Sequence, residues 1–200
     1  MQEQSLSLSD EQLAQRARSG EMLCFEELVR RWQVPLVRFL SRRMGDAMDA
    51  EDVAQETFVR AYQNLSSYRS RWPFKTWLFT IGYRLAVSQG RKSRARENAE
   101  SAVESRAEAS TPPEQAEQVE QRGVLWEAAR SSLSEEQFAA VWLFYVDEMP
   151  AGEIARVLGR SWVSVKTMLH RARKRLVTCL SPMTGREVPT KAGGSCCHVT

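Results

Sequence analysis

Apolar residues recur every three or four positions along most of the chain, which is the spacing of one face of an α-helix. In the N-terminal half this spacing predicts three helices, over residues 25–40, 49–65 and 74–89. Pro35 lies inside the first pattern and predicts a kink or a break there, because proline lacks a backbone N–H. Asp49 is expected to cap the second helix, with Asp52 at the capping-box position.

The C-terminal half continues the helical pattern. Four further helices are predicted, over residues 124–132, 135–146, 151–158 and 162–177. Gly159 separates the last two, and glycine suits a helix end because it adopts positive φ without strain. The sequence has no alternation typical of strands and no internal repeat. We therefore expect an all-α protein.

Residues 91–121 separate the two helical regions and lack apolar periodicity. They are rich in Ala, Glu and Ser and contain Pro112 and Pro113, which predicts a flexible linker. A length of 200 residues suits two small domains. The predicted divisions are an N-terminal segment over 1–20, a helical domain over 21–92, a flexible acidic linker over 93–121, a helix-turn-helix domain over 122–180 and a disordered cysteine-containing tail over 181–200.

The net charge of +3 conceals an uneven distribution of charges. Residues 57–96 carry nine Lys or Arg and no acid, and residues 154–186 carry eight, again with no acid. Between these blocks, residues 97–121 hold seven Glu and one Arg. Two acid-free basic blocks favour two surfaces that bind one polyanion, such as nucleic acid; solvated basic faces are the alternative.

The sequence shows neither a membrane-spanning segment nor a secretory signal. No apolar run approaches the roughly 20 residues that a bilayer span needs. Residues 1–10 are polar and acidic, unlike a secretory signal. We therefore expect the protein to stay in the cytoplasm, without membrane insertion.

The last two predicted helices have the pattern of a helix-turn-helix, in which the second helix lies in the major groove of DNA. The buried side of this second helix is formed by Val165, Leu169, Ala172 and Leu176. Its other side carries Lys166, Thr167, His170, Arg171, Lys174 and Arg175. Cations suit phosphates, and Arg, Lys and Thr reach base edges. His170 is either a base contact or an ordinary exposed histidine, and helical hairpins with a glycine turn are common in general.

An acidic face is predicted on the helix over residues 49–65. Asp49, Asp52 and Glu56 share one exposed side, where they would complement a basic partner. Compensation of the helix dipole is the alternative for the two aspartates, which lie near the predicted helix start. It explains Glu56 poorly, because that residue lies further along the helix.

Residues 65–78 interleave four aromatic residues with three cations and contain no acid. Such interleaving suits melted DNA, because unstacked bases lie on aromatic rings while cations hold the phosphates. The helical spacing of Phe74 and Trp77 also fits core residues. Tyr68 and Trp72 fall in a predicted loop, where a core role is less expected.

These segments carry a family resemblance. Residues 49–62 closely resemble the second conserved region of extracytoplasmic-function (ECF) sigma factors, in the helix that docks on RNA polymerase. Residues 132–146, 153–155 and 165–176 resemble the fourth conserved region, which binds the minus-thirty-five promoter element. The resemblance implies a protein, not an enzyme, that binds core RNA polymerase and directs promoter recognition, DNA melting and transcription initiation for a stress-response regulon. It also implies an anti-sigma factor as a candidate partner.

The resemblance assigns candidate residues to three surfaces. Those for core polymerase are Asp49, Asp52, Gln55 and Glu56. Those for the minus-ten element are Arg60, Tyr68, Arg69, Lys75, Arg84, Arg91 and Lys92. Those for the minus-thirty-five element are Ser161, Lys166, Thr167, His170, Arg171 and Lys174. For Arg91 and Lys92, the solvated start of a linker is the alternative to a grip on the DNA backbone.

The sequence departs from the usual residues of this family at several positions. Trp162 stands where a smaller aliphatic residue is usual, Val163 replaces a glycine, and Met168 replaces a frequent arginine. Arg84 stands where many members have asparagine, and Thr80 where a basic residue is frequent. We therefore expect a promoter sequence that differs from that of well-known members.

The cysteines suggest one further site. None of the four makes a C-x-x-C spacing, so free thiols are the default in a reducing cytoplasm. Cys179, Cys196, Cys197 and His198 are candidate ligands for a thiophilic metal, since thiolates and imidazole suit zinc and copper(I). The alternatives are a disordered tail with incidental cysteines and a redox pair formed under oxidising stress. Nothing else in the sequence requires a cofactor.

Two other classes of protein account for parts of the chain. A stand-alone helix-turn-helix repressor explains the C-terminal domain but not residues 49–62. A DNA-processing enzyme needs metal-binding acids that converge near DNA, whereas the acids here lie on one helix face or in the linker. Dependence of promoter binding on core polymerase separates a sigma factor from both.

Overall fold

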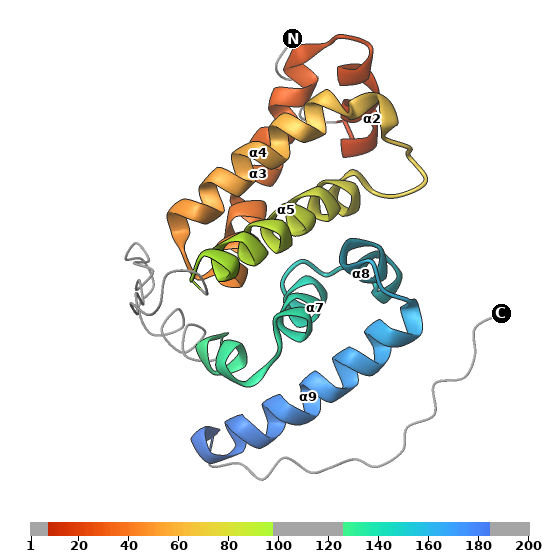
Figure 1. Ribbon diagram of the computed structural model, residues 1–200. Helices are drawn as coiled ribbons and strands as arrows, with labels where there is room; N and C mark the ends of the chain where they lie inside the picture. Colours follow the sequence, from red (N-terminus) through yellow and green to blue (C-terminus); the bar gives the residue numbers. More distant parts are fainter. Residues whose placement is uncertain (1–7, 98–125, 185–200) are drawn as a thin grey trace, which may run out of the picture.

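The structure, a computed structural model, describes residues 8–97 and 126–184 (Figure 1). All regular structure in these residues is helical, which confirms the all-α class. The helices are α2 (Asp10–Arg18), α3 (Met22–Met44), α4 (Ala47–Gln63), the short 3-10 helix η1 (Leu65–Ser67), α5 (Phe74–Glu97), α7 (Glu135–Tyr145), α8 (Ala151–Leu158) and α9 (Trp162–Thr184). Residues 126–132 are also helical and precede α7.

The N-terminal domain packs α2, α4 and α5 around the long helix α3 (Figure 1). The predicted apolar stripe of α3 is its buried side, with Leu28, Leu36 and Phe39 fully buried. Helix α2 lies in what the sequence suggested was only an N-terminal segment. Ser9 caps it in a capping box, and its three buried residues, which include Leu13, pack into the same core.

Two local expectations for this domain need correction. Pro35 does not break α3, which continues on both sides of it, because Leu28 before it and Leu36 after it are fully buried in the core; a kink at Pro35 stays a prediction. The cap of α4 is Asp46 rather than Asp49: its Oδ1 accepts hydrogen bonds from the backbone N–H groups of Met48 (2.8 Å) and Asp49 (3.1 Å). Asp52 therefore lies in the second turn of α4, beyond a capping box.

The C-terminal domain contains the predicted helix-turn-helix. Helix α8 ends at Gly159, which has a φ of 63° and so occupies the left-handed region that favours glycine. Helix α9 follows, and it packs on both α7 and α8. The helical residues 126–132 add Trp126, whose ring lies 4.7 Å from that of Trp142, between centroids. This arrangement confirms a helix-turn-helix built on a small apolar core.

Two helices run further than their apolar patterns. Helix α5 extends to Glu97 instead of residue 89, and α9 extends to Thr184 instead of residue 177. The extension of α5 is basic, and because Lys and Arg have high helix propensity it stays helical without an apolar stripe. The extension of α9, residues 178–184, contains no Lys or Arg, and its sequence does not explain why it is helical. None of the helices in the described ranges is long and apolar enough to cross a bilayer.

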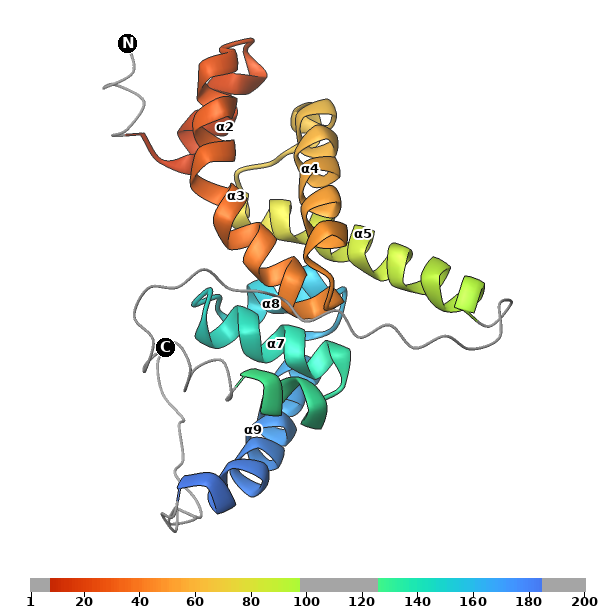
Figure 2. The same ribbon diagram turned by 90° about the vertical axis from the view of Figure 1, so that its left-hand side faces the viewer.

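The two domains lie against each other, which the sequence did not predict. Helix α8 packs on α5, and α7 packs on α3, as both views of the ribbon show (Figures 1 and 2). The buried apolar residues of both domains belong to one cluster. Most of the predicted linker, from residue 98 to residue 121, lies outside the described residues.

Candidate nucleic-acid interface

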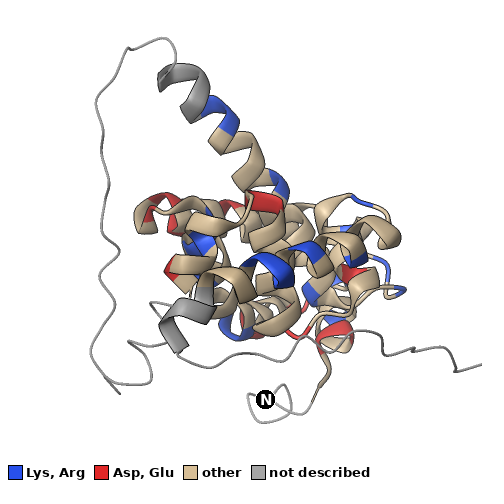
Figure 3. Cartoon of the chain, turned by 90° about the horizontal axis from the view of Figure 1, so that it is seen from below, with Lys and Arg blue, Asp and Glu red and all other residues tan. Residues whose placement is uncertain are grey.

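Helix α9 presents one side to the core and the other to solvent. Val165, Leu169 and Ala172 are buried at the predicted spacing. All the candidate DNA contacts of this domain are exposed, namely Ser161, Lys166, Thr167, His170, Arg171 and Lys174. In Figure 3, seen from below, where α9 lies, Lys and Arg recur along the ribbon. The exposed side is therefore basic and acid-free, as a major-groove helix requires.

The first turn of α9 adds two exposed apolar side chains. Ser161 acts as its N-cap, because its Oγ accepts a hydrogen bond from the backbone N–H of Ser164 (3.2 Å). Trp162 is 51% exposed and Val163 is 65% exposed. The amine of Lys166 lies 3.8 Å from the centre of the Trp162 ring, in a cation–π contact. The only sign of this surface in the sequence is that both residues lie outside the apolar stripe of α9.

The acidic face of α4 is exposed as expected. Asp52, Gln55 and Glu56 are exposed, while Asp49 is partly covered. Glu56 forms an ion pair with Arg60 at 2.6 Å. Because Asp52 and Glu56 lie beyond the first turn, compensation of the helix dipole does not account for them. A binding role for this face therefore gains support from the position of the helix start.

The loop before α5 differs from its prediction at one residue. Tyr68 is 5% exposed, and its hydroxyl donates a hydrogen bond to the carbonyl oxygen of Trp72 at 3.0 Å. Its ring packs against Phe74 and Trp77. Burial raises the pKa of Tyr68 to about 12. The expectation that Tyr68 is less suited to a core role than Phe74 and Trp77 is therefore wrong, because its ring completes an aromatic core cluster. Its contact with the minus-ten element stays a prediction.

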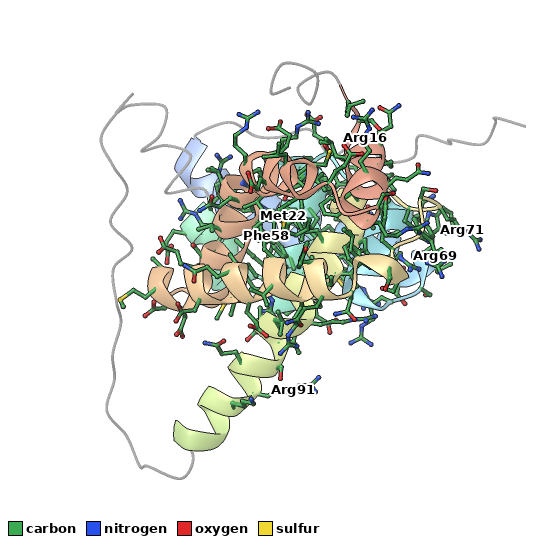
Figure 4. All side chains as sticks on the ribbon, turned by 90° about the horizontal axis from the view of Figure 1, so that it is seen from above. Arg16, Met22, Phe58, Arg69, Arg71 and Arg91 are labelled. Carbon is green, nitrogen blue, oxygen red and sulfur yellow. The ribbon has the colours of Figure 1, made fainter. Side chains whose placement is uncertain are left out.

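The cations proposed to contact the minus-ten element are mostly accessible. Arg69 and Arg71 project together at one edge of the domain, and Arg91 projects from α5 (Figure 4). Arg60, Arg84 and Lys92 are exposed as well. Lys75 is the exception, since its side chain is only 21% exposed and faces the C-terminal domain.

Of the four proposed metal ligands, the structure describes Cys179 alone, so the metal site stays a prediction. Cys179 is exposed, and its sulfur accepts a hydrogen bond from the Ser132 hydroxyl at 3.2 Å. Cys196, Cys197 and His198 lie outside the described residues. Within residues 8–97 and 126–184, no three His, Cys, Asp or Glu side chains are grouped as a metal site.

Comparison with known proteins places both domains in one family. The Sigma-70 region 2 family matches residues 28–96, which include α4 and most of α3 and α5. The Sigma-70, region 4 family matches residues 125–176, which include α7, α8 and most of α9. The residues between these matches, 97–124, include most of the predicted linker, 93–121.

Individual relatives match three quarters or more of the chain. The RNA polymerase sigma factor YlaC of Bacillus subtilis is 32% identical over 76% of this chain and 88% of its own length. The ECF RNA polymerase sigma-E factor of Escherichia coli K12 is 30% identical over 91% of this chain and 100% of its own length.

Two solved structures share the fold. Sigma factor RpoE of Bartonella quintana, in complex with the anti-sigma factor NepR, has a TM-score of 0.68 and 27% identity over 78% of this chain and 96% of its own. CnrH, in complex with the cytosolic domain of CnrY, has a TM-score of 0.64 and 28% identity over 86% of this chain and 97% of its own. The chain belongs to the ECF subfamily of RNA polymerase sigma factors.

Proposed function

We propose that this sigma factor uses the exposed basic side of α9 to read an upstream promoter element and the N-terminal domain to read and melt the downstream one. The observation that carries the proposal is the division of α9 into a buried apolar stripe and an exposed, acid-free side. Arg171 and Lys166 are suited to base edges, and Lys174 to phosphates. The chemistry of RNA synthesis belongs to the polymerase, so this role needs no catalytic residue in the chain.

The acidic face of α4, formed by Asp49, Asp52 and Glu56, is the proposed contact with core polymerase, together with the neighbouring Gln55. Exposed carboxylates steer association with a basic partner and fix its register. The ion pair between Glu56 and Arg60 is solvent-exposed and contributes little to the stability of the domain. Glu56 can therefore be changed without unfolding the domain.

Charge reversal tests this face. We expect the double variant Asp52→Lys and Glu56→Lys to lose co-purification with core RNA polymerase while its helical circular dichroism is unchanged. The matched control reverses two other exposed acids, Glu26→Lys and Glu127→Lys, and so changes net charge equally. Equal capture of wild type and the α4 variant would show that another surface binds the polymerase.

The cellular setting is proposed from the relatives. Both solved structures named above contain a second protein: the cytosolic domain of CnrY is bound to CnrH, and the anti-sigma factor NepR is bound to sigma factor RpoE. We propose that this chain, too, acts in the cytoplasm under an anti-sigma factor and serves a stress-response regulon. Affinity capture of the tagged chain from its own host, before and after stress, tests this: the partner should be retained before stress and released after it.

A further inference from the structure

A pocket of about 290 Å³ lies where α7 packs on the C-terminal end of α3 (Figure 2). Both domains line this pocket. The N-terminal domain contributes the last three residues of α3, and the C-terminal domain contributes residues of α7 and of the segment that precedes it. Ligand pockets have volumes of roughly 300–1,000 Å³, so this one has the size of a site for a small ligand. None of its described lining residues belongs to the promoter or polymerase surfaces proposed above.

The charges around the pocket are unevenly balanced. Arg42, Arg43 and Arg130 line it, and Glu135 is the single acid among its described lining residues. The remaining lining residues are apolar. A cleft with charges of one sign and walls of low dielectric constant concentrates the electric field and attracts ions of the opposite sign. The pocket is therefore suited to an anion.

Two of the three guanidinium groups are held in place by the protein itself. The Arg130 guanidinium donates a hydrogen bond to the carbonyl oxygen of Arg42 at 2.8 Å, and it lies against Gly45, where a Cβ would collide with its Nη2. Arg43 pairs with Glu135 at 3.3 Å, and its side chain is only 7% exposed. Side chains that are already ordered lose little conformational entropy when they bind a ligand.

The helix ends beside the pocket do not balance its positive charge. The C-terminus of α3 carries a partial charge of about −0.5, and the N-terminus of α7, at Glu135, carries about +0.5, so the two helix dipoles nearly cancel. The carboxylate of Glu135 offsets one of the three guanidinium charges. About two positive charges therefore remain for a ligand to neutralise.

We propose that this pocket binds a small polyphosphate anion, such as inorganic triphosphate or the phosphate chain of a nucleotide. Guanidinium groups bind phosphate oxygens through paired, charge-assisted hydrogen bonds. A chain of linked phosphates presents oxygens to several guanidinium groups at once and carries the charge that the pocket requires. A pocket of this volume has no room for a DNA duplex. The bound anion contacts both domains, so its binding stabilises their arrangement in this structure.

Isothermal titration calorimetry of the full chain with sodium triphosphate, without polymerase or DNA and at constant ionic strength, tests the site. We expect saturable binding of triphosphate to wild type, and weaker binding of sulfate, which is too short to reach several guanidinium groups at once. The melting temperature of the chain should also rise with triphosphate concentration, because a ligand that binds only the folded protein stabilises it.

Two variants should change the affinity in opposite directions. Arg42→Gln should weaken triphosphate binding about tenfold, which corresponds to about 1.4 kcal/mol and is close to the loss of one hydrogen bond to a charged group. Glu135→Gln should strengthen binding roughly twofold to fivefold, because it removes the carboxylate of a partly exposed ion pair that competes with the anion. The controls, Arg18→Gln and Glu26→Gln, make the same changes of charge at exposed positions outside the pocket and should bind like wild type.

Equal weakening by Arg42→Gln and Arg18→Gln would show that triphosphate binds basic surface in general, and would overturn the inference. An absence of saturable binding to wild type, or an unchanged affinity of Glu135→Gln, would overturn it as well. Displacement of bound triphosphate by short single-stranded DNA would assign the pocket to the DNA backbone instead. If Arg42→Gln loses its helical circular dichroism, Glu135→Gln decides. None of these outcomes bears on the proposed function, which is tested separately by capture of core polymerase.

Discussion

Asp147 provides the sharpest pH prediction, because its carboxylate is buried at the interface between the domains. Its side chain is 8% exposed, and its Oδ2 accepts no hydrogen bond from the described residues. Burial raises the pKa of Asp147 from 3.8 to about 6, although the positive charges of Lys75 and Arg38 oppose the shift. The charged form of this carboxylate is therefore less stable in the folded protein than in the unfolded chain.

The size and sign of the effect follow from this difference in pKa. A shift of about 2 pKa units corresponds to about 3 kcal/mol. Between about pH 4 and pH 6 the folded protein keeps a proton on Asp147 that the unfolded chain releases. The contribution of this group to the free energy of unfolding is therefore full below pH 4 and is lost as the pH rises through 6. Above pH 6 the folded protein holds an unfavourable buried charge.

Replacement of Asp147 by Asn removes that charge and keeps the shape of the side chain. We expect wild type and Asp147→Asn to have similar free energies of unfolding at pH 4, measured by urea denaturation. At pH 8 the variant should be more stable, by at most about 3 kcal/mol. Asp52→Asn, which removes an exposed carboxylate, should follow wild type at both pH values. A variant less stable than wild type at pH 8 would show that attraction to Lys75 outweighs desolvation, and would refute the reasoning.

Three further predictions concern DNA and the tail. Arg171→Ala should cost roughly 1–3 kcal/mol of promoter affinity in the polymerase complex and relax specificity at one upstream position. Lys174→Ala should instead weaken binding to all sequences and flatten the salt dependence of binding, and the opposite behaviour of the two variants would mean that α9 is rotated from the proposed orientation. Trp162→Ala should lower affinity most for promoters with a thymine under the first turn of α9, because apolar side chains contact the thymine methyl group. An equal loss of affinity for all promoters in a promoter-selection assay would show that Trp162 lies against the DNA backbone instead. Truncation after Pro182 should abolish any response of transcription to zinc, copper or cadmium, because Cys196, Cys197 and His198 are removed. If the full-length and truncated proteins respond identically to every metal and to peroxide, the tail is not a sensor.

Local patterns predicted the parts of the fold that depend on local forces. Helix α8 has the predicted bounds, and α7 ends one residue earlier than predicted, because each combines an apolar stripe with a clear start or stop signal. Helix α2 was missed because it is short and carries only three buried residues. Tyr68 was misplaced because a tyrosine among Ser and Arg suggests an exposed loop. Its packing partners, Phe74 and Trp77, cover it only once α5 has folded back.

The packing of the two domains has no local signal at all. The Thr76 hydroxyl donates a hydrogen bond to Glu153, 77 residues away in the chain, and each is an ordinary helix-start residue in its own segment. The candidate DNA contacts on α9 were predictable, since exposure there follows directly from helical periodicity. The partial burial of Lys75 was not, because it depends on a partner from the other domain.

Run-off transcription with purified core RNA polymerase and a genomic promoter library from the same host tests the central claim most directly. We predict transcripts from a small set of promoters with a shared upstream and downstream sequence, only when both the chain and core polymerase are present, and loss of these transcripts with the Asp52→Lys and Glu56→Lys variant. Transcripts that do not depend on the chain, or tight and specific binding of the chain to those promoters without polymerase, would contradict the account.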